Sequence, residues 1–343
     1  MKDKVSIIVP VHNSAAYIEN CIGSLMQQTY LNIEVLLVEN GSTDQSYHIC
    51  QTYEKADSRI RAFHLDESGV SHARNYGMQN ASGKYIAFAD SDDYCERDWC
   101  LRLIEAEEEG KHIYFPLCGY RKVRGYCQEI LQGYYYEDRE ISRIELADIL
   151  AVHDKALLNT PCNKLYQKSI IIEFGLGMPE DLSLGEDLVF NLSYLEVCGR
   201  KGFIIQNQLL YNYVRDGKES LDNGYREDYH YTVQRLYDAF YGFCIRKNIM
   251  INELFWKWAM WMYREALNNT NSEDNKQNIW KRYKINDRVM KDWRLTEIIK
   301  QIGQGNGMPA YVGYRSKSYA VLLLMQFYEK CKTNCKERWR NNG

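Results

Sequence analysis

The feature that most limits the fold of this chain is the alternation, in its first third, of short apolar runs with segments of helical periodicity. The apolar runs are VSIIVPV (5–11), EVLLVE (34–39), IRAFHL (60–65) and YIAFAD (85–90). The segments between them have the residue spacing of helices and lie at 16–28, 44–56 and 71–80. Near-continuous apolar strands separated by helices are typical of a parallel sheet covered on both faces. We therefore predict an α/β fold with a mostly parallel, Rossmann-like sheet flanked by helices.

The ends of these strands predict where a ligand binds. In open α/β sheets, ligands bind beyond the carboxyl ends of the strands. Pro10, Glu39 and Asp90 lie at such ends, and Asp90 is followed closely by Asp92 and Asp93. The strand exits are therefore the candidate site.

Three carboxylates after one apolar strand need a physical explanation. Asp90, Asp92 and Asp93 repel one another, and each resists ionising beside its neighbours. A divalent cation such as Mg²⁺ or Mn²⁺ removes this conflict, because hard cations prefer oxygen ligands. The alternative is a capped turn, since Asp and Ser favour turns. We favour a metal site.

Composition excludes some classes of protein. A formal net charge of −3 argues against a general nucleic-acid binder, which usually carries a basic surplus. There are eleven cysteines and no Cys-x-x-Cys, and the N-terminus enters a strand without a signal peptide. These features predict reduced thiols and a cytoplasmic location. No apolar run approaches the roughly 20 residues that a membrane-spanning helix needs.

Beyond residue 113 the alternation loosens. The segments 112–123 and 202–214 have the character of strands, whereas ISRIELADIL (141–150) has the pattern of a capped helix. From about Tyr225 the sequence is helical and aromatic. These changes predict three parts, at 1–115, 116–224 and 225–343.

Five segments in order resemble family 2 glycosyltransferases with the GT-A fold, of the bacterial surface-polysaccharide type. They are VSIIVPVHN, EVLLVENGSTD, SGVSHARNYGMQNASGKYIAFADSDDY, NKLYQKS and GEDLVFNLSYL. An isolated Asp-x-Asp is common by chance, but five motifs in register over about residues 4–215 are specific. The resemblance implies that 1–115 binds a nucleotide sugar, that 116–224 supplies the acceptor side and the base, and that 225–343 is a helical C-terminal region.

The resemblance also implies a donor site at the strand exits. Asp92, with Asp90, matches the family's metal-binding Asp-x-Asp, and Asp93 is the third candidate ligand. The metal, Mn²⁺ or Mg²⁺, would stabilise the departing diphosphate as a Lewis acid. The residues implied in donor binding are Pro10, Val11, Asn13, Glu39, Asn40, Arg74, Asp90, Ser91, Lys164 and Arg215.

Several of these donor-site residues carry a specific expectation. Asn40 stands where relatives have an Asp that accepts from the uracil N3–H, and its amide oxygen can also accept. Arg74 matches a basic residue that faces the base or the diphosphate; the alternative is a solvated helix face. Lys164 packs the floor of the site or faces phosphate. The segment YNYVRDGKES (211–220) resembles one that closes over the donor in relatives, and its Arg215 is expected to contact the diphosphate.

The motif GEDLVF supplies the expected catalytic base. By resemblance, Asp187 deprotonates the acceptor hydroxyl, with Glu186 as the second candidate, and this requires a carboxylate within hydrogen-bond reach of that hydroxyl. The alternative is capping of a helix N-terminus, where acidic residues are favoured.

The expected reaction is one inverting transfer from a nucleoside-diphosphate sugar, with uridine as the expected nucleoside, to a saccharide or lipid-linked saccharide in polysaccharide biosynthesis. Such an enzyme is a hexosyltransferase. The processive Gln-x-x-Arg-Trp signature is absent from the sequence. A nucleotidyltransferase is one alternative, although PVHNSAAY lacks a Gly-rich phosphate loop. An inactive sugar-nucleotide or glycan-binding module is another, although both acidic motifs are retained.

The C-terminal segment 318–343 places apolar residues before a basic tail. It is expected either to lie on the inner face of the cell membrane, near anionic headgroups, or to pack on the protein's own core. A second copy of the chain, in a homo-oligomer, is a further expected partner.

Overall fold

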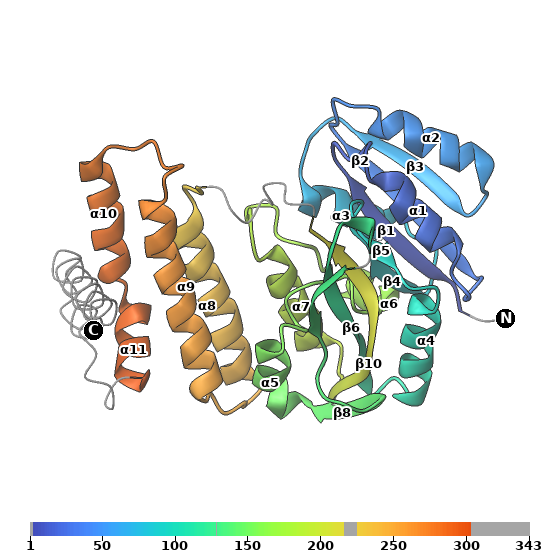
Figure 1. Cartoon of the computed structure of the whole chain (residues 1–343). Helices are drawn as coiled ribbons and strands as arrows, with labels where there is room; N and C mark the ends of the chain where they lie inside the picture. Colours follow the sequence, from blue (N-terminus) through green and yellow to red (C-terminus); the bar gives the residue numbers. More distant parts are fainter. Residues whose placement is uncertain (1–2, 128, 216–224, 303–343) are drawn as a thin grey trace, which may run out of the picture. The chain divides into compact units, whose positions relative to one another are not determined.

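The computed structural model describes residues 3–127, 129–215 and 225–302 (Figure 1). Within these ranges the chain forms two compact units. Among the described residues, the first comprises 3–127, 129–215 and 242–250, and the second comprises 225–241 and 251–302. The three-part division at residues 115 and 224 remains a prediction.

The first sheet of the first unit has the strand order β3-β2-β1-β4-β9. Its strands are β1 (Val5–Val11), β2 (Ile33–Asn40), β3 (Ile60–Leu65), β4 (Tyr85–Phe88) and β9 (Tyr166–Gln167). The first four are parallel, and the short β9 runs antiparallel to β4. The predicted, mostly parallel sheet is confirmed.

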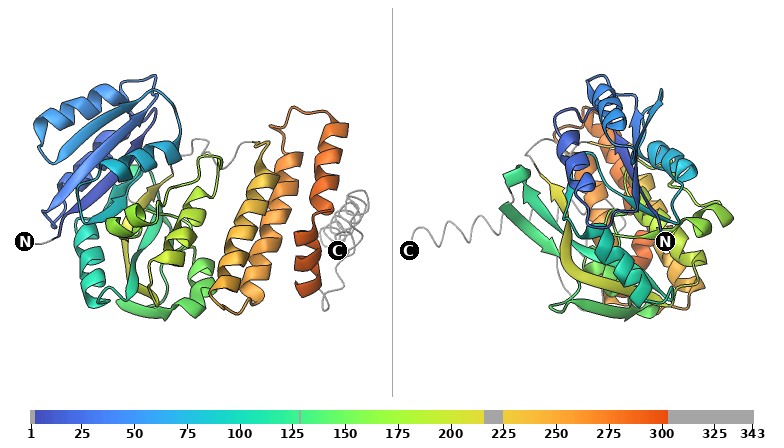
Figure 2. Two further views of the ribbon diagram at one scale, coloured as in Figure 1. Left: turned by 180° about the vertical axis from the view of Figure 1, so that it is seen from behind. Right: turned by 90° about the vertical axis from the view of Figure 1, so that its right-hand side faces the viewer.

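Helices cover both faces of this sheet, as the apolar strands predict. The helices α1 (Ile18–Met26) and α2 (Ser46–Ala56) lie on one face, and α3 (Val70–Asn80) lies on the other (Figure 2). Every residue of β1 and β2 is buried. Strands buried on both faces have no polar side to alternate with, which explains their continuous apolar sequences.

The second sheet has the order β5-β10-β6-β7, with β8 also paired to β10. Its strands are β5 (Tyr94–Cys95), β6 (Tyr114–Arg124), β7 (Glu129–Tyr134), β8 (Ile141–Glu145) and β10 (Gly202–Val214). The helix α4 (Trp99–Glu109) connects β5 to β6.

The helix predicted at 141–150 is wrong in its first half. Residues 141–145 form β8, which pairs antiparallel with the first part of β10. A short 3₁₀ turn (Leu146–Asp148) follows, and the helix α5 begins at Ile149 and ends at Asp154. Pairing with a distant strand overrides the local helical pattern here.

Two further helices complete the first unit, and four lie wholly or partly in the second. The first two are α6 (Lys168–Glu173) and α7 (Glu186–Val197). The other four are α8 (Tyr229–Arg246), α9 (Glu253–Asn271), α10 (Ile279–Met290) and α11 (Trp293–Ile302), which confirms the helical character expected from Tyr225. Segment 318–343 lies outside the described residues.

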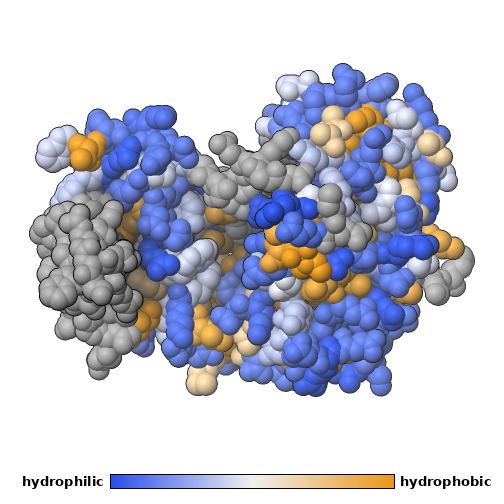
Figure 3. All heavy atoms as spheres, in the orientation of Figure 1, coloured by the Kyte–Doolittle hydropathy of each residue, from blue (hydrophilic) through white to orange (hydrophobic). Residues whose placement is uncertain are grey.

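Exposed apolar side chains on the visible face form small groups among hydrophilic ones (Figure 3). Among the described helices, none is long and apolar enough to cross a bilayer.

Close packing fixes α3 on the sheet. A Cβ atom added at Gly77 would lie 2.4 Å from Cγ2 of Ile8 on β1. The glycine therefore lets the helix approach the strand more closely than any larger residue would allow. Gly23 in α1 is different, because a Cβ atom there would meet nothing within 4 Å.

We predict that Gly77→Ala lowers the free energy of unfolding by about 1–3 kcal/mol, because the added methyl overpacks the contact with Ile8. The matched variant Gly23→Ala should raise it by about 0.4–1 kcal/mol, because alanine has less conformational freedom to lose. Urea denaturation of both variants measures the difference. Equal stability of the two variants would contradict the close packing of α3.

Candidate active site

The predicted donor-site residues from three strand exits lie at one edge of the first sheet. Val11, at the end of β1, is in register with Glu39 on β2, and Asn40 is the last residue of β2. Pro10 and Val11 are buried in β1. The loop that carries Asp90 follows β4, whose strand is parallel to β1. Because the strands are parallel, their carboxyl ends meet at this edge.

Glu39 and Asn13 shape the loop after β2. The fully buried Glu39 accepts from the backbone N–H of Ser42 at 2.5 Å through one oxygen, and its other oxygen lies 2.5 Å from Nδ1 of His64. Asn13 adopts a left-handed backbone (φ 49°), and its Oδ1 accepts from the N–H of Thr43 at 2.9 Å. In this structure both side chains act on the loop itself.

Asn40 differs from its neighbours in having an unsatisfied acceptor. The residue is 2% exposed, and its Oδ1 has no hydrogen-bond partner among the described residues. An unpaired buried acceptor costs about 1–3 kcal/mol. This oxygen is therefore suited to accept from a ligand N–H, such as that of a nucleobase, once the site opens to it.

Asp93 anchors the carboxylate loop to the second sheet. Its two oxygens accept from the N–H of Val214 and from the hydroxyl of Tyr211, both at 2.8 Å. The backbone N–H of Asp90 donates to the same hydroxyl at 2.9 Å. Burial, reinforced by Asp92 and Asp90, raises the pKa of Asp93 well above its usual range. This geometry favours a structural role for Asp93 and gives no support to its expected role as a metal ligand.

Asp92 and Asp90 remain the carboxylates suited to a cation. Asp92 is exposed, and the side chain of Asp90 is 22% exposed. Ser91 between them is buried, with its hydroxyl 2.7 Å from that of Ser14. The described residues contain no group of three or more potential metal ligands. Two carboxylates nevertheless fit Mg²⁺ or Mn²⁺, because such ions are commonly held by one or two carboxylates together with substrate phosphates.

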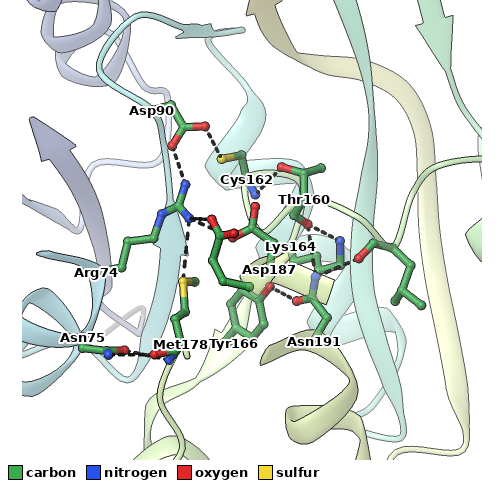
Figure 4. Close-up of polar contacts among 12 residues, drawn as sticks. Arg74, Asn75, Asp90, Thr160, Cys162, Lys164, Tyr166, Met178, Asp187 and Asn191 are labelled. Carbon is green, nitrogen blue, oxygen red and sulfur yellow. Dashed lines mark hydrogen bonds and ion pairs between the residues drawn. The ribbon is translucent and has the colours of Figure 1, made fainter. Parts of the chain in front are cut away.

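Arg74 connects this loop to the start of α7 (Figure 4). Its side chain is 4% exposed. One terminal nitrogen donates to Asp90 at 2.8 Å, and the other donates to Asp187 at 2.7 Å. The second nitrogen also lies 3.5 Å from Glu186 and 3.7 Å from the sulfur of Met178. The structure thus brings together the predicted metal-side carboxylate and both candidate bases.

Asp187 has the properties of a candidate base. It lies in the first turn of α7, after Gly185 in a left-handed conformation (φ 81°), and the side chain of Asp187 is 19% exposed. Burial raises the pKa of Asp187 to about 8 against the effect of Arg74, while Glu186 and Asp90 add to the increase. A carboxyl group with a pKa near 8 can accept a proton close to neutral pH.

Lys164 lies in the buried interior, close enough to Asp187 for the two charges to interact. It is fully buried, and its ammonium group donates to the carbonyls of Leu157 and Thr160 and to Oδ1 of Asn163. Burial lowers the pKa of Lys164 to about 7. Because the three acceptors use all three N–H groups of the ammonium, the geometry supports the packing interpretation. It gives no support to a phosphate contact.

Arg215 lies next to a range that the structure does not describe. Its guanidinium carbon is 4.7 Å from the centre of the Tyr213 ring, and its backbone N–H donates to the carbonyl of Val123 at 2.8 Å. Nothing in these contacts tests its expected role at the diphosphate.

Sequence reasoning missed three residues at this site. Tyr211 holds the carboxylate loop, and Cys162 places its sulfur 3.5 Å from the second oxygen of Asp90. Asn75 accepts from the N–H of Met178 at 2.7 Å and donates to its carbonyl at 3.0 Å. The position of Asn75 directly after Arg74 in SHARN was the available signal. The other two contacts depend on tertiary structure.

Comparisons with known proteins bear on the family and the fold of this chain. The model of the glycosyl transferase family 2 matches residues 6–175. The uncharacterized glycosyltransferase EpsJ of Bacillus subtilis is 34% identical over 208 residues, or 60% of each chain. Glycosyltransferase GlyA of Streptococcus pneumoniae is 33% identical over 219 residues, or 61% of this chain and 29% of GlyA. The matches therefore span less than two thirds of either relative.

A solved structure shares the fold. The crystal structure of S. aureus TarS 1–349 in complex with UDP-GlcNAc has a TM-score of 0.64 and 19% identity, covering 96% of this chain and 92% of that chain. This likeness confirms the expected GT-A fold.

We predict that Tyr211→Phe lowers the free energy of unfolding by about 1–3 kcal/mol, because Asp93 and the N–H of Asp90 lose a buried partner. Tyr120→Phe is the control, since the hydroxyl of Tyr120 makes one longer bond, 3.3 Å to the carbonyl of Ala156. Urea denaturation compares the two variants. A smaller loss for Tyr211→Phe than for Tyr120→Phe would contradict the anchoring role.

Proposed function

Because the chain belongs to glycosyltransferase family 2, we propose that it transfers one sugar, with inversion, from a UDP-sugar to a saccharide or lipid-linked saccharide acceptor. The UDP donor is supported by the fold shared with TarS, whose complex contains UDP-GlcNAc. The acceptor class and a role in bacterial surface-polysaccharide synthesis are supported by the resemblance of the five sequence motifs.

The observation that carries this proposal is the shared guanidinium of Arg74. It lies 2.8 Å from Asp90 on the carboxylate loop and 2.7 Å from Asp187 on α7. Transfer with inversion needs a leaving group held on one side of the anomeric carbon and a base on the other. The two groups assigned to these tasks lie far apart in the sequence, and both contact the same side chain.

On the donor side, Asp92 and Asp90 would hold a divalent cation together with the diphosphate oxygens. When bound, such a cation supplies Lewis-acid stabilisation of the leaving nucleoside diphosphate. Asn40 would accept a hydrogen bond from an N–H group of the nucleobase with its unsatisfied Oδ1. As a neutral acceptor, it makes a weaker hydrogen bond than a carboxylate would.

On the acceptor side, Asp187 removes the proton from the attacking hydroxyl. The hydroxyl oxygen forms a bond to the anomeric carbon as the bond from that carbon to the diphosphate oxygen breaks. Attack opposite the leaving group inverts the configuration. The proton remains on Asp187, and the bonding electrons leave with the diphosphate.

The proposal is tested by incubating the protein with a panel of UDP-, GDP- and dTDP-sugars, with Mn²⁺ or with EDTA. We expect Mn²⁺-dependent turnover of a UDP-sugar. Asp92→Ala should abolish it, because loss of this ligand releases the cation that neutralises the diphosphate. Asp66→Ala is the control, since Asp66 follows β3 with a fully exposed side chain. Full activity of Asp92→Ala, or activity in excess EDTA, contradicts the metal assignment. With added pyrophosphate, cleavage between the phosphates to give a nucleoside triphosphate and a sugar 1-phosphate would instead indicate a nucleotidyltransferase. Binding without turnover would indicate an inactive module.

The role of Asp187 has a separate test. Asp187→Asn keeps the shape and capping capacity but cannot accept the proton, so turnover should fall by about 10²-fold or more with donor binding nearly unchanged. In the wild-type protein, kcat/KM should rise with pH and level off above about pH 8, because the base must be deprotonated to act. Loss of donor affinity with retained turnover would show that Asp187 is a donor ligand.

A further inference from the structure

We propose that Arg74 is a positioning residue, which fixes the base Asp187 relative to the metal-side carboxylate Asp90 and does not itself bind the donor. This inference rests on the proposed function and deepens it. It differs from the expectation based on the family motif, which places this arginine against the nucleobase or the diphosphate of the donor.

The two ion pairs use different ends of one rigid group. One terminal nitrogen of Arg74 donates to Asp187 and the other donates to Asp90. A guanidinium is planar, and its N–H groups point in fixed directions. Two carboxylates bound to its two terminal nitrogens are therefore held at a defined separation and orientation (Figure 4).

The existing ion pairs of Arg74 argue against direct donor contact. Its side chain is 4% exposed, and both of its terminal nitrogens already donate to carboxylates. Turning toward a diphosphate would require it to release Asp90 or Asp187. Release would leave a partly buried carboxylate without its counter-charge, which is strongly unfavourable.

The element that carries Arg74 is itself fixed on both sides. On one side, Gly77 allows α3 to pack closely on Ile8 of β1. On the other, Asn75 binds both the N–H and the carbonyl of Met178, and its Nδ2 also donates to Glu180 at 2.8 Å. The guanidinium therefore projects from a rigid helix toward the segment that leads into α7.

This arrangement predicts that Arg74 contributes to turnover more than to binding. Displacement of a reacting group by about 1 Å can reduce the rate by about 10²-fold. Donor affinity depends on the carboxylate loop, which Tyr211 and Asp93 hold in addition to the contact of Arg74 with Asp90. A lysine in place of Arg74 keeps the charge but is a point cation without the planar fork.

The experiment compares Arg74→Met and Arg74→Lys with Arg200→Met. Arg200 is the matched control because it is also buried and paired to a buried carboxylate, Glu107 at 2.7 Å, and because it bonds the carbonyl of Tyr114 at the first residue of β6. The readouts are kcat and KM for transfer, the Kd of UDP with Mn²⁺ by calorimetry, the pH profile of kcat/KM, and thermal unfolding.

We expect kcat of Arg74→Met to fall by about 10²-fold with the Kd of UDP and Mn²⁺ nearly unchanged. Arg74→Lys should lie between this variant and wild type. The rising limb of the pH profile should move to higher pH in Arg74→Met. Asp187 would then face Glu186, Asp90 and Lys164 without its closest cation. Arg200→Met should lower thermal stability and leave kcat and the pH profile unchanged.

A rise in the Kd of UDP that accounts for the whole loss of activity would overturn the inference, because Arg74 would then be a donor ligand. Behaviour like that of Arg200→Met would also overturn it, because the role would be structural. If Arg74→Met does not fold, Arg74→Lys decides between these outcomes by the same readouts. Absence of transfer by the wild-type protein would overturn the proposed function, whereas normal transfer by the Arg74 variants would overturn this inference alone.

Discussion

The buried guanidinium of Arg74 is the interaction on which the candidate site depends. A single cation lies within 3.5 Å of three carboxylates, those of Asp90, Asp187 and Glu186. Carboxylates so close together repel one another in a poorly hydrated site, and the cation between them makes the arrangement stable. Removal of one partner from a buried ion pair typically costs about 3–5 kcal/mol, because the remaining charge is uncompensated. The same contact therefore maintains both the structure of the site and its chemistry.

The two sheets of the first unit supply the other constraints on this cluster. The parallel strands bring the exits of β1, β2 and β4 to one edge. The second sheet reaches the same loop through β10, since Tyr211 and the backbone of Val214 hold Asp93. Asp93 is thus buried and bound to the second sheet, whereas Asp92 is exposed. Adjacent, identical residue types therefore differ in what they can contact because their burial differs.

The sequence predicts the parallel sheet and the edge at which the site lies, because both follow from periodicity and from the general behaviour of parallel strands. By motif, it also proposes Asp90, Arg74 and Asp187 as candidate site residues. It does not predict that one of these contacts the other two, because contacts between distant segments depend on packing. For the same reason, the helical pattern at 141–145 does not predict the pairing of β8 with β10, and the sequence alone does not predict the three acceptors of Lys164.

The most direct measurement is the crystal structure of the protein with UDP and Mn²⁺, with the metal located by its anomalous scattering. We expect one anomalous peak in contact with Asp92 and the diphosphate, and a guanidinium of Arg74 that still bridges Asp90 and Asp187. A peak away from the strand exits would contradict the proposed metal site, and a guanidinium of Arg74 that has left Asp187 to bind the diphosphate would contradict its positioning role.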